Sequence, residues 1–181
     1  MLKVILMALA AIVVVLVIVV ALRPSEYRVE RTTIIAASPA AVFAHVNDLH
    51  KMQVWSPWAK LDPEARNTFD GPPAGIGAAF TWAGNKSVGE GRMTITDSRP
   101  GELVGMKLDF MKPFASTATT EFTFRPEGGH TAVTWSLAGR HSFIPKAVGL
   151  FMSVDKMIGD QFEKGLVNLK AVTEAAKGAG R

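Results

Sequence analysis

The chain has no cysteine among its 181 residues. That absence excludes a disulfide framework, a thiol nucleophile and a metal held by cysteine. It leaves the compartment open, because a protein without cysteine suits an oxidising and a reducing environment equally.

A large excess of one charge is also lacking. The chain carries 20 Lys and Arg residues against 16 Asp and Glu residues, for a formal net charge of +4. The basic residues are scattered among acids and turns, whereas a nucleic-acid-binding surface is expected to gather them in a stripe. We therefore expect no nucleic-acid partner.

Motifs that carry catalysis or hold cofactors are missing as well. The sequence has no G-x-S-x-G elbow, Gly-rich phosphate loop or nucleotide fingerprint. His45 and His50 lie five positions apart instead of at the i, i+4 spacing of a helical metal pair, and no HExxH motif accompanies them. For these and for His130 and His141 we expect surface or capping roles, with no metal and no cofactor. The sequence contains no specific set of catalytic residues. Whether the protein is an enzyme therefore stays open, and we lean toward a protein that is not one.

The first positive feature is a long apolar run near the N-terminus. Val4 to Leu22 is about 19 apolar residues, which as a helix would span about 28 Å, against a hydrocarbon core of roughly 30 Å. A secretory signal peptide is the competing interpretation, but its apolar region usually has about 7 to 15 residues and Val-Val-Ala matches an Ala-x-Ala cleavage site poorly. We expect residues 1–23 to form a single-pass membrane anchor. Basic residues on its two flanks are nearly balanced, so the side of the membrane stays open.

The remainder has the size of one domain, which we assign to residues 24–177, with a disordered tail at 178–181. Its first strand is expected at Tyr27 to Ala36, and Ser38 followed by Pro39 predicts the start of a short helix. A second short helix or turn is expected over 51–58, and further strands over 75–84, 87–97, 103–111, 116–125 and 131–139. Polar and apolar residues alternate cleanly over 103–111, 116–125 and 131–139, so each of these strands buries one face.

A long amphipathic helix is expected from Ile144 to Ala176. At about 100° per residue, one apolar stripe collects Ile144, Val148, Phe151, Ile158, Phe162, Leu166, Leu169 and Val172. The economical packing lays this helix across the concave face of a curved antiparallel sheet, an α+β fold. Asp155 interrupts the stripe, since it projects from the same face.

Three stretches, SPAAVFAHVNDLHKMQVWSPW, GNKSVGEGRMTI and DKMIGDQFEKGLVNLK, together with this order of elements, resemble the START-like or SRPBCC superfamily, in particular polyketide cyclase/dehydrase-like proteins. The resemblance covers nearly everything after the apolar run. It implies a helix-grip fold with a deep cavity between sheet and long helix, used for apolar ligands such as lipids, sterols and polyketides. It implies no particular reaction, because members range from carriers to cyclases.

Candidate ligand contacts combine aromatic and methionine side chains that face the expected cavity. Trp55 and Trp58 flank Pro57 where the resemblance places the cavity mouth, and an amphipathic ring suits such a rim, although core packing is the alternative. Methionine adds adaptable apolar surface. For Trp82, for Trp135 and for each single methionine, packing in the core is the first expectation and ligand contact is the alternative. The candidates are Trp55, Trp58, Trp82, Met93, Met106, Phe110, Trp135, Phe151, Asp155 and Ile158.

Asp155 has several interpretations. On a buried face its carboxylate would lose hydration, so it must be paired, raised in pKa or exposed at a cavity mouth. We expect a structural ion pair first, with Arg92, Arg140, Lys107 and Tyr27 as possible partners. A ligand-contacting acid, a general acid or base, and exposure through a helix kink stay open.

These features lead to one main hypothesis, a membrane-anchored domain that binds a small hydrophobic or amphipathic ligand such as a lipid or a polyketide-like molecule. The first alternative is a cyclase or dehydratase that uses a cavity acid such as Asp155. The second is an anchored protein-interaction module with a filled core. The sequence leaves the ligand's identity and the oligomeric state open.

Overall fold

The computed structural model describes residues 1–22, 24–140 and 153–179. An N-terminal helix, α1 (Leu2–Leu22), precedes the domain. The domain begins with β1 (Glu26–Ile35), α2 (Pro39–Val46), α3 (Leu49–Trp55) and the short 3-10 helix η1 (Trp58–Lys60). The strands β2 (Arg66–Asp70), β3 (Ala79–Ala83), β4 (Glu90–Arg99), β5 (Leu103–Lys112), β6 (Ser116–Glu127) and β7 (His130–Arg140) follow, and α5 (Val154–Ala179) comes last.

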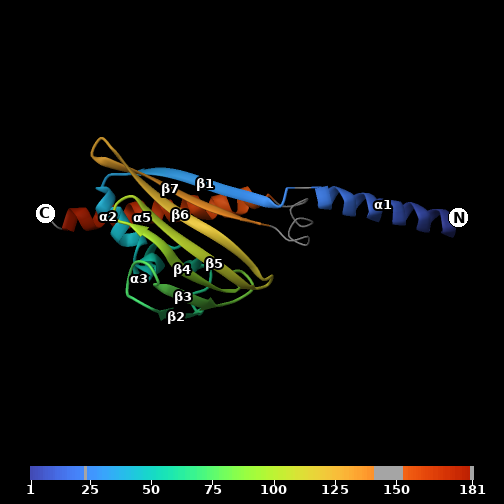
Figure 1. Cartoon of the computed structure of the whole chain (residues 1–181), viewed down its shortest axis with the longest axis horizontal. Helices are drawn as coiled ribbons and strands as arrows, with labels where there is room; N and C mark the ends of the chain where they lie inside the picture. The colour runs from blue at the N-terminus through green and yellow to red at the C-terminus, as the bar shows by residue number, and fades with distance from the viewer. Residues whose placement is uncertain (23, 141–152, 180–181) are drawn as a thin grey trace.

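The strands form one seven-stranded antiparallel sheet in the order β1-β7-β6-β5-β4-β3-β2. The sheet curves around α5, which runs along β1, while α2 and α3 lie at the end where β1 finishes (Figure 1). This arrangement confirms the predicted α+β fold of a curved sheet on a long C-terminal helix, with two short helices after the first strand.

The two short helices start where side chains satisfy their free backbone N–H groups. The Ser38 hydroxyl accepts a hydrogen bond from the backbone N–H of Ala41 at 3.4 Å, and Pro39 occupies the first turn. Asp48 caps α3 by accepting from the backbone N–H of His50 at 2.9 Å. The start of α2 was predicted from the sequence, whereas the cap at Asp48 was not.

The apolar stripe of α5 is buried against the sheet, as its periodicity predicts. Phe162, Leu166 and Leu169 are each at most 2% exposed. Two polar contacts hold the later turns of the helix to β1. The Lys170 ammonium donates to the carbonyl of Ile34 at 3.0 Å, and the Glu174 carboxylate accepts from the backbone N–H of Ala36 at 2.8 Å.

The strand β2 was not predicted, because its sequence, RNTFD, has a single apolar residue. It is an edge strand, and only Phe69 turns toward the interior. The first part of the predicted long helix, residues 144–152, lies outside the described residues, and so does the candidate Phe151.

The helix α1 projects from the domain as a separate apolar rod (Figure 1). It is the one described helix long and apolar enough to cross a membrane, with a mean hydropathy of 3.5, and Val20 is its buried residue. By length and composition it fits a membrane anchor and a signal sequence alike.

Candidate ligand-binding surface

Strand register decides which side chains share the concave, inner face of the sheet. Trp135 on β7 lies opposite Phe122 on β6 and Arg31 on β1, and every second residue from these positions points the same way. The same alternation places Val104, Met106, Leu108 and Phe110 of β5, Gly91, Met93 and Ile95 of β4, and Phe80 and Trp82 of β3 on this face.

One part of the inner face is filled by an aromatic cluster, which consists of Trp55, Trp58, Phe122, Trp135 and Phe162. Trp135 stacks on Phe162 of α5, with ring centroids 4.0 Å apart and planes 9° apart, and on Phe122 at 4.7 Å. Trp55 and Trp58 each meet Trp135 edge-on at 5.7 Å. These rings fill the part of the space that lies between α5 and strands β6 and β7.

Two indole N–H groups of this cluster donate hydrogen bonds. The Trp135 indole N–H donates to the Thr120 hydroxyl at 2.8 Å, which in turn donates to the carbonyl of Ser136 at 2.8 Å. The Trp55 indole N–H donates to the carbonyl of His45 at 3.1 Å. Satisfied indole groups are typical of structural core aromatics.

The other part of the inner face carries apolar side chains that stay partly exposed. Trp82, Met93 and Phe110 are half-buried, and they continue from the more deeply buried Phe80 and Leu108. We call these five residues the open apolar strip. It crosses β3, β4 and β5, away from β1, along which α5 packs.

Trp82 lies flat along this strip because its neighbour on β4 has no side chain. A Cβ added at Gly91 would come within 2.5 Å of the indole ring, so glycine is needed there. The indole N–H donates to the carbonyl of Val88 at 3.1 Å, and the ring meets Phe110 edge-on with centroids 6.0 Å apart. Trp82 therefore presents an anchored, partly exposed apolar face.

Tyr27 is the polar group of the inner face at the end of the sheet where β1 begins. Its ring lies over Gly139 of β7, where an added Cβ would be 2.8 Å from the phenol oxygen. Burial raises the pKa of the Tyr27 phenol above its ordinary value of 10.0. The hydroxyl therefore remains protonated and uncharged at neutral pH.

Asp155 was expected on the buried face of the long helix, and this expectation is wrong. Its side chain is 62% exposed, in the first turn of α5. The carboxylate forms an ion pair at 3.1 Å with Arg31 of β1, which also binds Glu163 at 2.9 Å. An ion pair was expected, but Arg31 was not among the predicted partners.

The guanidinium of Arg31 bridges two turns of α5 across Gly159, over which it packs closely. Its hydrogen bond and charge lower the pKa of the Asp155 carboxyl below its ordinary value of 3.8. A carboxyl that is ionised, paired and exposed is poorly suited to serve as a general acid near neutral pH.

The predicted site residues therefore separate into three groups. Trp55, Met106 and Trp135 are buried in the core, and Trp58 packs at its edge. Trp82, Met93 and Phe110 lie together in the open apolar strip, while Ile158 is half-buried on α5. Contact of any of them with a ligand stays a prediction. Sequence reasoning missed Phe80, Leu108 and Arg31, although strand alternation already pointed to the first two.

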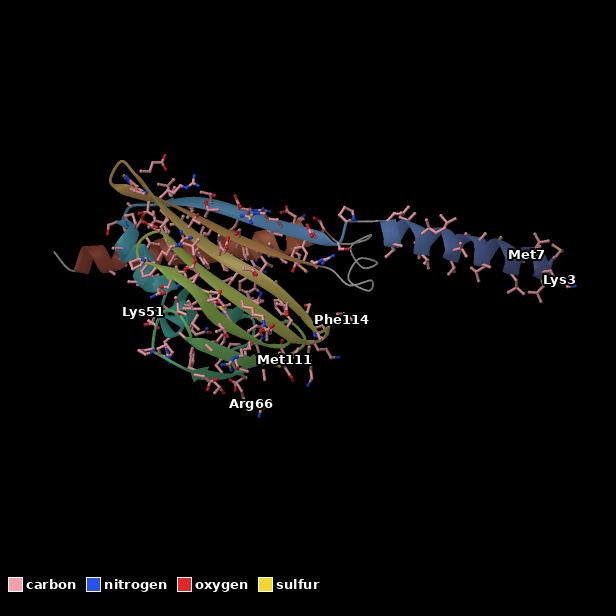
Figure 2. All side chains as sticks on the ribbon, viewed as in Figure 1. Lys3, Met7, Lys51, Arg66, Met111 and Phe114 are labelled. Atoms are coloured by element: carbon pink, nitrogen blue, oxygen red, sulfur yellow. The ribbon has the colours of Figure 1, made fainter. Side chains whose placement is uncertain are left out.

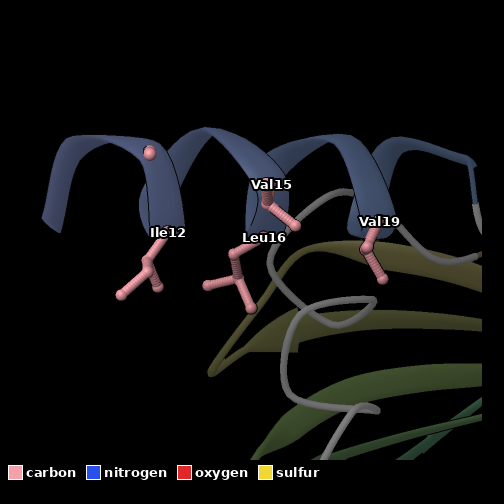
Figure 3. A pocket seen from close by; sticks show the side chains of 5 residues that line it. Ile12, Val15, Leu16 and Val19 are labelled. Atoms are coloured by element: carbon pink, nitrogen blue, oxygen red, sulfur yellow. The ribbon is translucent and has the colours of Figure 1, made fainter. Parts of the chain in front are cut away.

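Two shallow hollows are lined wholly by described residues, and neither lies between α5 and the sheet. One runs along α1 beside Ala11, Ile12, Val15, Leu16 and Val19 (Figure 3). The other lies on the outer side of α5 and is lined by Asp160, Glu163, Lys164, Val167 and Asn168. Among the described residues, no group of three or more His, Asp or Glu side chains is placed to hold a metal ion.

Comparison with known families assigns the domain. A family described as "Polyketide cyclase / dehydrase and lipid transport" matches residues 26–174. The chain belongs to this family. The fold of the family implies a hydrophobic ligand-binding cavity between sheet and helix. No curated protein matches the sequence.

Solved structures show the same fold at low sequence identity. Protein CV1439 from Chromobacterium violaceum is 16% identical, with a TM-score of 0.59 over 84% of this chain and 99% of its own. Protein Ms6760 from Mycobacterium smegmatis is 17% identical, with a TM-score of 0.57 over 82% of this chain and 92% of its own. The di-domain ARO/CYC StfQ from the steffimycin biosynthetic pathway is 14% identical, with a TM-score of 0.62 over 85% of this chain and 52% of its own.

Proposed function

We propose that the protein is a membrane-anchored domain that binds a small hydrophobic or amphipathic molecule, lipid-like or polyketide-like, between the sheet and its long helix. The observation that carries this proposal is the open apolar strip, where Trp82, Met93 and Phe110 remain partly exposed beside a filled aromatic cluster. Partly exposed apolar side chains that line a concave surface are typical of sites for apolar ligands.

The chemistry of the open apolar strip fits a ligand that has an apolar body and a small polar group. Its five side chains are aromatic or aliphatic, and methionine adapts to ligands of varied shape. Tyr27 adds a phenol ring with a polar edge to the same face, at the end where β1 begins. Neither a metal nor a cofactor is needed for binding of this kind.

The membrane part of the proposal rests on α1. Its side chains are almost all exposed and apolar, which is unfavourable in water and favourable in lipid. Family membership supports a lipid as the ligand, since the family description includes lipid transport. The same description also names polyketide cyclase / dehydrase. Against the cyclase alternative, Asp155, the acid that it would use, is exposed and paired with Arg31.

Binding can be tested by quenching of tryptophan fluorescence with a brominated fatty acid, in which bromine quenches rings that it touches. We expect Trp82→Phe to remove the quenchable fraction of the emission. Trp55→Phe, a matched change of a fully buried ring, should leave that fraction in place. Absence of quenching in the unchanged protein up to the solubility limit of the fatty acid would count against the proposal. Native mass spectrometry of protein released gently from its own membrane would identify a bound molecule.

A further inference from the structure

At the end of the sheet where β1 begins, each of the other strands also begins or ends. Strand pairing shows which residues lie at this end, because paired residues lie side by side in neighbouring strands. The pairs are Glu26 with Arg140, Gly139 with Ala118, Ser116 with Phe110, Lys112 with Glu90, and Glu90 with Ala83. The β5–β6 hairpin, which turns at residues 113–115, therefore lies at the same end as Glu26.

The helix α1 must also lie at this end. It finishes at Leu22 and β1 starts at Glu26, so residues 23, 24 and 25 alone join them. Three extended residues span roughly 10 Å. The end of the sheet that carries Glu26 thus stands next to the point where α1 leaves the domain (Figure 1).

The β5–β6 hairpin exposes two large apolar side chains at this end. Met111 is 52% exposed and Phe114 is 49% exposed, and both belong to the hairpin and not to the core. Figure 2 shows Phe114 at the tip of the hairpin, on the side of the domain from which α1 departs. Between them lie Lys112, whose ammonium pairs with Glu90 at 2.8 Å, and Pro113, which has no N–H to satisfy.

The turns at the opposite end of the sheet have a different composition. The β4–β5 turn reads Arg-Pro-Gly-Glu at 99–102, and the β6–β7 turn reads Glu-Gly-Gly-His at 127–130. In both turns the exposed side chains are polar or small. The third connection at the far end, between β2 and β3, exposes one large apolar side chain, Ile76 at 62%. The β5–β6 hairpin differs in that it places two such side chains at the end of the sheet next to α1.

We propose that the β5–β6 hairpin is a second membrane contact, which places Met111 and Phe114 in the interfacial region of the bilayer that holds α1. This inference rests on the proposed role of α1 as an anchor. The hairpin enters only to the level of the lipid headgroups, because its turn contains backbone groups that need water or headgroup partners. Lys112 can extend its ammonium toward those headgroups from the same level.

A second contact gives the domain a fixed orientation on the membrane. A single helix with a three-residue link permits tilting, whereas two contacts hold one end of the sheet against the lipid. Phe110, which directly precedes Met111, belongs to the open apolar strip, and Tyr27 lies at the same end. The hairpin thereby turns the strip's end toward the bilayer, from which an apolar ligand can enter it.

The absence of cysteine makes a clean test possible, since any introduced cysteine is the only one. The full chain is placed in phosphatidylcholine and phosphatidylglycerol vesicles with an environment-sensitive fluorophore at one position. Phe114→Cys reports on the hairpin, and Glu127→Cys, on the exposed turn at the far end, is the matched control. Val13→Cys, in the middle of α1, reports on the anchor. Each variant is first checked for an unchanged circular dichroism spectrum.

We expect the label at Phe114→Cys to shift to shorter wavelength and to be quenched by lipids that carry a nitroxide near the headgroup. The label at Glu127→Cys should stay aqueous and be quenched by iodide. In a second measurement without a fluorophore, a polar water-soluble maleimide should react several-fold more slowly with Phe114→Cys than with Glu127→Cys.

The outcomes separate the inference from the proposed function. If Phe114→Cys behaves like Glu127→Cys while the Val13→Cys label is quenched from within the bilayer, the hairpin contact is refuted and the anchor stands. If the Val13→Cys label is aqueous as well, the anchor and the hairpin contact are both refuted. The inference is supported if the labels at Phe114→Cys and Val13→Cys are both quenched from the lipid and the label at Glu127→Cys is quenched only by iodide from the water.

Discussion

Phe162 and Asp155 lie seven positions apart on one face of α5, yet their surroundings are opposite. Phe162 is 2% exposed and stacked on Trp135, whereas Asp155 reaches into water and is held by Arg31. A helical projection gives the direction of a side chain but not the groups that it contacts. The difference between these two residues is a property of the tertiary structure.

Phe162→Ala should destabilise the domain by about 3 to 5 kcal/mol, because it removes a ring from the centre of the aromatic cluster and leaves a cavity. Val167→Ala, on the exposed side of the same helix, should change stability by less than about 0.5 kcal/mol. Urea unfolding of the two variants measures both values. A cost for Phe162→Ala no larger than that of Val167→Ala would show that the cluster does not support the helix.

The pairing of Asp155 with Arg31 should appear as a dependence of stability on pH. Because the folded pKa of Asp155 is lowered from 3.8, the pair stabilises the protein fully above that value, and its contribution is lost as pH falls through the lowered pKa. Asp155→Asn should therefore lower the urea midpoint near pH 7, and the difference from the unchanged protein should shrink as the pH approaches about 2.

Asp160→Asn provides the control for this measurement, since it changes an exposed carboxyl on the same helix that does not bind Arg31. We expect the midpoint of this variant to follow that of the unchanged protein across the same pH range. A deficit of Asp155→Asn that stays constant with pH would mean that the carboxylate's charge is not what stabilises the fold.

At the scale of elements, α5 approaches the sheet closely because of two glycines. A Cβ added at Gly165 would come within 2.6 Å of the Trp135 ring and 3.1 Å of the Pro57 side chain, both of which are held by packing. A Cβ added at Gly159 would instead meet the end of the Arg31 side chain, which can move. The same substitution therefore has different consequences at the two positions.

Gly165→Ala should destabilise the domain by about 1 to 3 kcal/mol, since the helix or the ring must shift. At Gly159→Ala, the gain in helix propensity of up to about 1 kcal/mol offsets the displacement of Arg31, and the net change should be small. Thermal melts of the two variants compare these effects directly. Equal behaviour of the two variants would contradict the close approach of α5 at Trp135.

Most elements could be predicted from the sequence because local signals agree with the final packing. Alternation identified the long strands, the pair Ser38 and Pro39 identified the start of α2, and a 3.6-residue period identified α5. The edge strand β2 was missed, because it has one apolar residue and is specified by its pairing with β3. The separation of the inner face into a filled and an open part depends on contacts between distant segments, which no local pattern contains.

At the scale of the whole molecule, we expect α1 and the domain to fold as separate units. The core is formed by residues of the domain, and Val20 is the buried residue of α1. Deletion of residues 1–22 should therefore give a soluble protein that unfolds cooperatively. Size-exclusion chromatography and a thermal melt test this, and an aggregate without a cooperative transition would show that α1 is needed for the fold.

Under the proposed anchoring by α1, the three-residue link between α1 and β1 would limit how far the domain can travel. A free carrier diffuses between distant membranes with its cargo, but a domain on a link of roughly 10 Å stays within about its own diameter of one bilayer. With α1 as an anchor, the domain can lift a molecule out of its own membrane and display it there. Delivery further away then requires an acceptor that comes to the domain.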